Sequence, residues 1–141
     1  MKTSKFGTDI TSDDIIDTLG FFDGWEDRYK YIIDLGKELP PLDEADYNDA
    51  NLVRGCQSRV WLVVEPSDGK LCFAADSDAF IVKGLLAVVL AAYNGKTPDQ
   101  VLSFDIEGYF SELNLLKHLS ATRGNGLKAM VGRIQAIAET V

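Results

Sequence analysis

The hydrophobic pattern of the first forty residues is helical. Apolar residues recur at helical spacing after Thr11 and Ser12, either of which can cap a helix, until Asp23-Gly24 breaks the pattern. They recur again from about Trp25 to Leu39, where two consecutive prolines must end the segment. The pattern therefore predicts two helices that form an N-terminal hairpin.

The middle of the chain has the β-branched and aromatic composition of strands. Val60–Val64 and Lys70–Ala74 flank the turn sequence Pro66–Gly69, so they predict an antiparallel β-hairpin. We expect Leu52–Arg54 to add a short third strand, which ends where Gly55 lets the backbone turn. This arrangement puts Cys56 on a loop at the end of the sheet.

The second half of the chain is again helical. Apolar residues cover nearly the whole circumference of residues 77–93, which marks a helix buried on most sides. Thr97 and Pro98 begin a short helix, and a brief helical segment follows over residues 109–116. A final amphipathic helix is predicted from about Asn125 to Glu139. This order of elements predicts an α+β fold, with a small antiparallel sheet of about three strands packed with several helices.

Composition and length predict one soluble domain over residues 1–141. Hydrophobic residues make up 46% of the chain, enough for one continuous core. The net charge of −8 opposes contact with nucleic acid and anionic membranes, so we exclude both as partners. The longest apolar run, Leu85–Tyr93, is too short for a membrane helix, and the N-terminus lacks the apolar core of a signal peptide. We therefore expect a cytoplasmic protein.

The two cysteines, Cys56 and Cys72, fit a reducing compartment but differ in their surroundings. Cys72 lies in the second predicted strand, where a small apolar thiol is an ordinary core residue. Cys56 lies in a polar loop, two residues after Arg54. Because nearby cations favour the thiolate, Cys56 is the candidate reactive residue. The residues that support it in the loop are Gly55, Gln57, Ser58 and Arg59.

The set of possible metal ligands is small. A cysteinyl cluster or a structural zinc site takes about four ligands, whereas this chain has two cysteines and the single His118. We therefore expect no metal and no cofactor of its own. A cysteine hydrolase would need His118 as the base beside Cys56, and this function stays open as an alternative.

The run Val53–Trp61 resembles the V-x-G-C-Q-S-x-V-W signature of the SufE family of sulfur acceptors. Further segments are similar to that family's later motifs, in the same order, and Trp25–Gly36 is similar to its N-terminal helix. These segments are residues 75–79, 81–88, 93–97 and 123–127. The chain departs from some relatives at residues 120–122, which read Ser-Ala-Thr where those relatives have Ser/Thr-Pro-Ser. The resemblance extends from about Asp13 to the end of the chain.

The resemblance implies a fold, a function and a partner. A SufE- or CsdE-like protein binds a pyridoxal-phosphate-dependent cysteine desulfurase of the SufS or CsdA kind and stimulates it. It takes persulfide sulfur onto the cysteine that matches Cys56 and delivers it for iron–sulfur cluster assembly, to a scaffold or another sulfur acceptor. The pyridoxal phosphate belongs to the desulfurase. The chain is thus expected to be a sulfurtransferase-type activator, not an independent enzyme, with a SufE/NifU-like fold.

Sulfur transfer places two opposite demands on Cys56. Exchange with a persulfide needs an accessible thiolate, while the persulfide product must be shielded from other thiols. We therefore expect Cys56 to alternate between a site tucked against Leu52, Val53 and Trp61 and an exposed position. Gly55 would supply the hinge.

Polar residues outside the loop are weaker candidates. Asp76 fits a helix cap, as do Ser77 and Asp78 beside it, and it could also hold the cysteine loop closed. Arg123 and Asn125 fall at the predicted start of the last helix. Asn125 fits a cap there, and both residues are alternatively contacts for a partner.

Two further interpretations remain open. The second candidate function is a cluster scaffold of the NifU type, although a scaffold needs several ligands and this chain has one plausible thiolate. The acidic segments 13–27 and 43–49 are interpreted as solvated faces, and either of them could also meet a basic patch on a partner.

Overall fold

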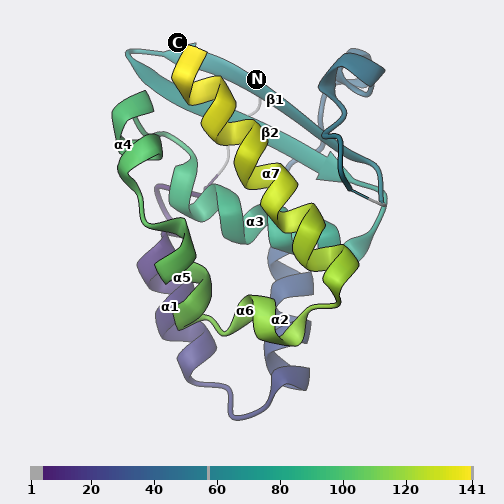
Figure 1. Ribbon diagram of the computed structural model, residues 1–141, viewed down its shortest axis with the longest axis vertical. Coiled ribbons are helices and arrows are strands. Elements are labelled where there is room, and N and C mark those ends of the chain that lie inside the picture. The colour runs from purple at the N-terminus through teal and green to yellow at the C-terminus, as the bar shows by residue number, and fades with distance from the viewer. Residues whose placement is uncertain (1–4, 57, 141) are drawn as a thin grey trace.

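The computed structural model describes residues 5–56 and 58–140, which form an α+β fold (Figure 1). A two-stranded antiparallel hairpin lies at one end of the molecule and α1, α2, α5 and α6 lie at the other. The elements are α1 (Ser12–Gly20), α2 (Trp25–Lys37), η1 (Glu44–Asp46), η2 (Asp49–Asn51), β1 (Val60–Ser67), β2 (Lys70–Ser77), α3 (Phe80–Tyr93), α4 (Pro98–Ser103), α5 (Ile106–Glu112), α6 (Leu115–His118) and α7 (Ala121–Thr140). The predicted fold class is confirmed.

The two N-terminal helices form where the sequence predicts them. Thr11 and Asp14 form a reciprocal capping box, in which the Thr11 hydroxyl accepts from the Asp14 N–H at 3.3 Å. Both helices pack on α3, with α2 making the larger contact, so they are held by α3 more than by each other as a paired hairpin. None of the described helices combines the length and the hydropathy needed to cross a bilayer.

The hairpin has a tight turn and two distinct faces. Asp68 and Gly69 have φ values of +52° and +77°, as a two-residue type I′ turn requires. Side chains of Leu62, Phe73 and Ala75 point into the core. The expected third strand at residues 52–54 is wrong. Its contact with β1 is one isolated bridge, between Leu52 and Trp61, because the chain turns away immediately afterwards at Gly55.

Helix α3 is the centre of the fold. Its residues from Gly84 to Tyr93 are all buried, as their nearly continuous apolar character predicts. It crosses α2 where Gly36 faces Gly84, because a Cβ atom on Gly84 would lie 2.2 Å from the Ile32 carbonyl oxygen. The buried Asn94 follows, and its amide group accepts from the Phe73 N–H and donates to the Phe6 carbonyl.

The C-terminal helices differ in detail from the expected ones. The capping box of Thr97 and Gln100 begins α4 as predicted. The helical segment expected over 109–116 is two helices, α5 and α6, because Asn114 adopts a left-handed φ of +52° between them. Helix α7 begins at Ala121, four residues before its expected start, and then runs alongside the hairpin from its open end toward its turn (Figure 1).

Candidate functional site

Cys56 lies in the loop between η2 and β1, at the open end of the hairpin. The loop is closed at its base by a hydrogen bond of 2.8 Å from the Val53 N–H to the Val60 carbonyl. Gly55 directly before the cysteine has a φ of +92°, which L side chains rarely adopt. A glycine is therefore required at this turn, and it aims the cysteine back toward the protein.

The thiol of Cys56 rests against α7. Its Sγ atom is 3.5 Å from the carbonyl oxygen of Gly126, to which it donates a hydrogen bond. A Cβ atom on Gly126 would lie 3.6 Å from the sulfur, and one on Gly55 would lie 3.2 Å from the Cβ atom of Ala129. Leu52, Val53 and Trp61 are the neighbours predicted from the sequence for the tucked thiol. The hydrogen bond of the thiol goes to α7.

Burial sets the acid–base state of the thiol. The side chain is half-buried, and this burial raises the pKa of Cys56 above its ordinary value. The expectation that nearby cations favour the thiolate is therefore wrong for this conformation. Arg54 is exposed to water, where solvent screens its charge, and desolvation of the sulfur dominates. The resting cysteine is a protonated, protected thiol.

The far end of the cysteine loop is fastened to the end of β2. The Arg59 N–H donates to the Asp78 carboxylate at 3.1 Å, and the Asp78 N–H donates back to the Arg59 carbonyl at 3.3 Å. The Ser77 hydroxyl donates to the same carbonyl at 2.7 Å. Ser58 is half-buried beside this clasp, whereas Gln57 lies outside the described residues.

Asp76 is not the helix cap that was one of its two expected roles. It belongs to β2, and neither it, Ser77 nor Asp78 caps α3, because the N-cap residue is Ala79. Its carboxylate accepts from the Tyr47 hydroxyl at 2.6 Å and pairs with the Lys83 ammonium at 3.3 Å. Asp76 thus anchors the segment before the cysteine loop to the sheet.

The start of α7 brings further polar groups near the thiol. Arg123 and Asn125 are exposed residues of its first turns, within three positions of Gly126. Asn125 is not the expected cap, because Ser120 accepts from the Arg123 N–H at 3.2 Å. The exposure of both side chains leaves them accessible to a partner.

Arg133 is a site residue that the sequence analysis missed. Its guanidinium donates to the carbonyl oxygens of Leu52 at 3.3 Å and Ala50 at 3.1 Å. These bonds tie α7 to the chain immediately before the cysteine loop. An arginine within a helix carries no sequence signal for a contact with a loop about eighty positions away.

The other two candidate side chains lie away from this arrangement. Cys72 is half-buried, not a core residue, because it pairs with Glu65 on the face of the hairpin opposite the core. His118 stacks on Trp25, with ring centroids 4.6 Å apart, while the hydrogen bond recorded for Cys56 goes to a carbonyl. Over residues 5–56 and 58–140, no three His, Cys, Asp or Glu side chains converge as metal ligands do.

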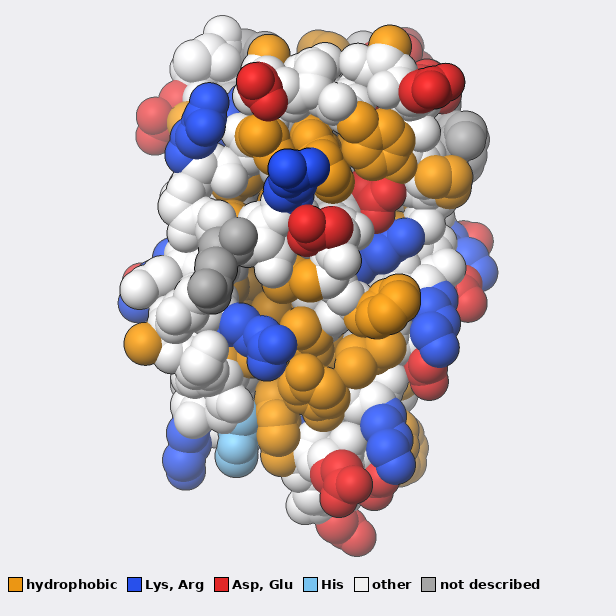
Figure 2. Space-filling model, turned by 90° about the vertical axis from the view of Figure 1, so that its right-hand side faces the viewer, with side chains coloured by type: hydrophobic (Ala, Val, Ile, Leu, Met, Phe, Trp, Pro, Cys, Tyr) orange, Lys and Arg blue, Asp and Glu red, His pale blue; other side chains and the backbone are white. Residues whose placement is uncertain are grey.

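The face around the open end of the hairpin combines apolar and cationic groups. Figure 2 shows hydrophobic side chains in a band through its centre, with Lys and Arg side chains beside the band. Phe80, in the first turn of α3, is 77% exposed. It lies two residues after Asp78, which clasps the cysteine loop.

Comparison with known proteins places this chain in a family. Residues 13–138 match the family described as "SufE: Fe-S metabolism associated domain". The chain is 45% identical to a SufE-like protein of Rhizobium meliloti strain 1021 over 131 residues, which cover 90% of this chain and 94% of the relative. It is 47% identical to a SufE-like protein of Rhizobium etli, with coverages of 90% and 88%.

A solved structure shares the fold. It is the solution structure of a hypothetical protein from Thermus thermophilus, which superposes with a TM-score of 0.74 at 19% identity and covers 92% of this chain and 93% of its own. At this identity the likeness concerns the fold alone. The match of the family to residues 13–138 and the two rhizobial relatives show that the chain belongs to the SufE family, which is associated with iron–sulfur metabolism.

Proposed function

We propose that this protein receives persulfide sulfur on Cys56 from a cysteine desulfurase and passes it on for iron–sulfur cluster assembly. The observation that carries the proposal is the half-buried thiol of Cys56, held on a glycine-hinged loop against Gly126 in a chain of the SufE family. Such a thiol can be shielded at rest and presented when a donor binds. No cofactor of its own is needed, because the pyridoxal phosphate belongs to the desulfurase.

The transfer step is a thiol exchange that needs no external oxidant. The Cys56 thiolate attacks the outer sulfur of the donor's cysteine persulfide, and a new sulfur–sulfur bond forms on Cys56. The sulfur–sulfur bond of the donor breaks, its cysteine leaves as a thiolate, and that thiolate takes up a proton. Delivery repeats the exchange with an acceptor thiol, which regenerates Cys56.

The resting geometry requires a movement before this attack. Burial raises the pKa of Cys56, so the tucked thiol is a poor nucleophile. Gly55 supplies a backbone hinge, and release of Arg59 from Asp78 would free the other end of the loop. Docking of the desulfurase is the event that exposes the thiol. Hydrogen exchange at the Gly55 and Cys56 amides should then quicken when the desulfurase is added, and unchanged exchange would refute the movement.

The exposed side chains near the loop fit a protein partner. A phenylalanine that is 77% exposed is a natural anchor for an apolar pocket, and Arg123 can contact carboxylates at the rim of such an interface. We infer that this face, the one seen in Figure 2, meets the desulfurase. The expected setting is the cytoplasm, where thiols stay reduced.

The two alternative functions have less support. Cys56 precedes β1, whereas Cys72 pairs with Glu65 far along the hairpin. Glu65 lies five positions along the strand from Val60, roughly 17 Å, which places Cys72 away from the start of the strand, whereas a cluster scaffold needs its thiols together. A hydrolase would need His118 beside Cys56, but its imidazole stacks on Trp25.

The decisive experiment is intact-mass measurement after incubation with a cysteine desulfurase, free cysteine and pyridoxal phosphate. We expect an adduct of about 32 Da, one sulfur atom, on the wild type and on Cys72→Ser, but not on Cys56→Ser. Sulfide release by the desulfurase under reductant should rise with the first two proteins only. Absence of the adduct from all three would refute the proposal and reopen the alternatives.

A further inference from the structure

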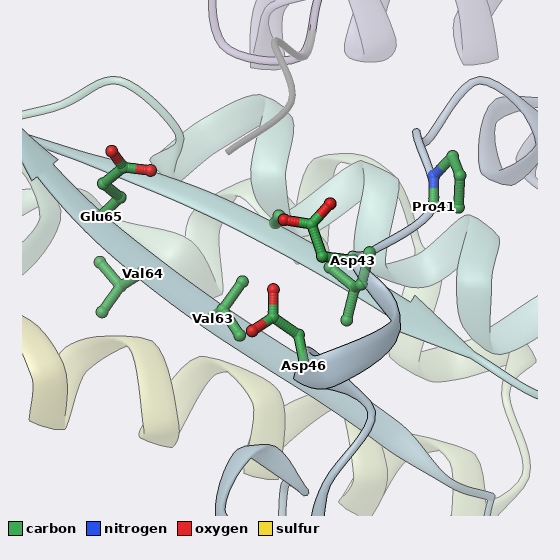
Figure 3. Close-up of a pocket in the computed structure, with 8 residues that line it drawn as sticks. Pro41, Asp43, Asp46, Val63, Val64 and Glu65 are labelled. Carbon is green, nitrogen blue, oxygen red and sulfur yellow. The ribbon is translucent and has the colours of Figure 1, made fainter.

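A groove lies on the outer face of the hairpin, away from the helices. It has a volume of about 260 Å³. Its lining residues are Pro41, Leu42, Asp43, Asp46, Val63, Val64, Glu65 and Ala74. Figure 3 shows the segment that carries Asp43 and Asp46 crossing the hairpin beside Val63. We call this segment, residues 41–47, the strap.

The floor of the groove is apolar, and the strap is held rigidly over it. Val63 pairs with Ala74 across the two strands, and both side chains project to the outer face. The Leu42 N–H donates to the Tyr47 hydroxyl at 3.1 Å, and that hydroxyl donates to Asp76 at 2.6 Å. The groove is therefore bounded by a preformed wall.

The wall carries uncompensated negative charge. Residues 43–49 contain four carboxylates and neither lysine nor arginine. The ion pairs of the described residues do not include Asp43 or Asp46, both of which line the groove. An apolar floor with carboxylates at its side is complementary to a segment that presents lysine or arginine next to an apolar residue.

The edge of β1 beside the groove is open. The Val60 carbonyl accepts a hydrogen bond from the Val53 N–H on the edge of β1 that faces away from β2. Because the main-chain groups of every second residue of a strand point to the same edge, the Val64 N–H and C=O point there too. Neither group of Val64 has a partner within residues 5–56 and 58–140. Pro66, which lacks an N–H, follows on the same edge, as is typical of an edge strand. A short extended segment could therefore also bind to main-chain groups there.

We propose that this groove docks a basic, extended segment of a partner protein, in which cationic and apolar residues alternate. An extended chain directs successive side chains to opposite sides, so one side can fill the apolar floor while the other meets Asp43 and Asp46. The proposal goes beyond sulfur transfer and does not depend on it. The Cys56 thiol faces α7 and not the groove, so a partner bound in the groove does not contact the thiol.

The test uses the full-length protein and a fluorescent peptide in which lysine and valine alternate. An isomer of the same composition, with its lysines in one block, measures attraction by charge alone. Fluorescence anisotropy should show tighter binding of the alternating peptide. The double variant Asp43→Asn, Asp46→Asn should weaken that binding roughly fivefold or more, since two ion pairs are lost.

A control variant makes the same change in net charge away from the groove. Asp17→Asn with Asp27→Asn removes two exposed carboxylates of α1 and α2 and should leave the affinity nearly unchanged. Amide chemical shifts should change at residues 42–46 and 63–65 when the alternating peptide binds. The proposal is overturned if the block isomer binds equally well, if both double variants weaken binding alike, or if the shifts change elsewhere.

Discussion

Gly126 determines how much room the sulfur of Cys56 has. Its carbonyl accepts the thiol hydrogen bond, and its missing side chain leaves a space directly beside the sulfur. A persulfide places a second sulfur atom next to Sγ, so this space is where the product can be shielded. Glycine within a helix is unfavourable by about 1 kcal/mol relative to alanine. Among the glycines of α7, Gly126 is the one whose missing side chain faces the sulfur of Cys56.

We predict that Gly126→Ala leaves the protein folded but exposes the persulfide. Its methyl group would lie 3.6 Å from Sγ, an ordinary contact for the thiol that leaves no room for the outer sulfur. Sulfide release from persulfidated Cys56 by dithiothreitol should become several-fold faster, as measured by the decay of the adduct in intact-mass spectra.

Gly132→Ala is the matched control for that substitution. It lies in the same helix with nothing within 4 Å of the added carbon. Both variants should gain up to about 1 kcal/mol of stability from helix propensity, but Gly132→Ala should not change the rate of sulfide release. Equal rates in both variants would show that the outer sulfur does not lie beside Gly126.

The residues of the site differ in how far the sequence reveals them. Cys56 and Gly55 can be identified from the local sequence, because a cysteine that directly follows a turn glycine is recognisable within a few residues. Gly126 and Arg133 do not, since they reach the loop from seventy or more positions away. The pKa direction was wrong for the same reason. Arg54 is visible in the sequence, whereas the burial that outweighs it is a property of the packed chain.

At the scale of elements, predictions succeeded where a segment carries its own signals. The capping boxes at Thr11 and Thr97 and the turn at Asp68-Gly69 mark their elements without help from the rest of the chain. Predictions failed where contacts with other segments determine the structure. A third strand at residues 52–54 requires a longer pairing with β1 than the turn at Gly55 allows. Helix α7 starts earlier than predicted because Ser120 caps it, although Asn125 is also a residue type suited to a cap.

The contact of α2 with α3 gives a prediction at this scale. We expect Gly84→Ala to destabilise the protein by roughly 2–4 kcal/mol, because the added carbon would lie 2.2 Å from the Ile32 carbonyl oxygen and the helices must separate. Urea denaturation followed by circular dichroism measures the change. Gly20→Ala in α1, with open space around the added carbon, should be nearly neutral. A stability of Gly84→Ala equal to that of Gly20→Ala would show that the crossing is not tightly packed.

At the scale of the whole molecule, the thiol and the acidic strap lie on different sides of one hairpin. The inner side packs on the helices, and α7 covers the thiol at the open end. The outer side carries the strap, which Tyr47 joins to Asp76. The outer face carries the carboxylates of the strap, whereas the cysteine loop holds Arg54 and Arg59 together with the Asp78 carboxylate that binds the Arg59 N–H. This separation gives one small protein two distinct contact surfaces.

The stability of the whole protein should also report the burial of Cys56. Because the folded-state pKa of the thiol is raised, the unfolded chain ionises first as pH rises. The stabilising contribution of the protonated, buried thiol is thus fully present below about pH 8.5, the ordinary cysteine pKa, and is lost as pH rises through the folded-state pKa.

Urea denaturation at pH 7, 8, 9 and 10 tests this linkage. We expect the free energy of unfolding of the wild type and of Cys72→Ser to fall relative to that of Cys56→Ser as pH rises above about 8.5. Burial also raises the pKa of Tyr93 and Tyr109, but these side chains are common to all three proteins and cancel in the comparison. If the difference between wild type and Cys56→Ser stayed constant with pH, the thiol would be ionising as freely in the folded protein as in the unfolded chain. The resting loop would then be open, and the shielding of the persulfide would have to come from the partner.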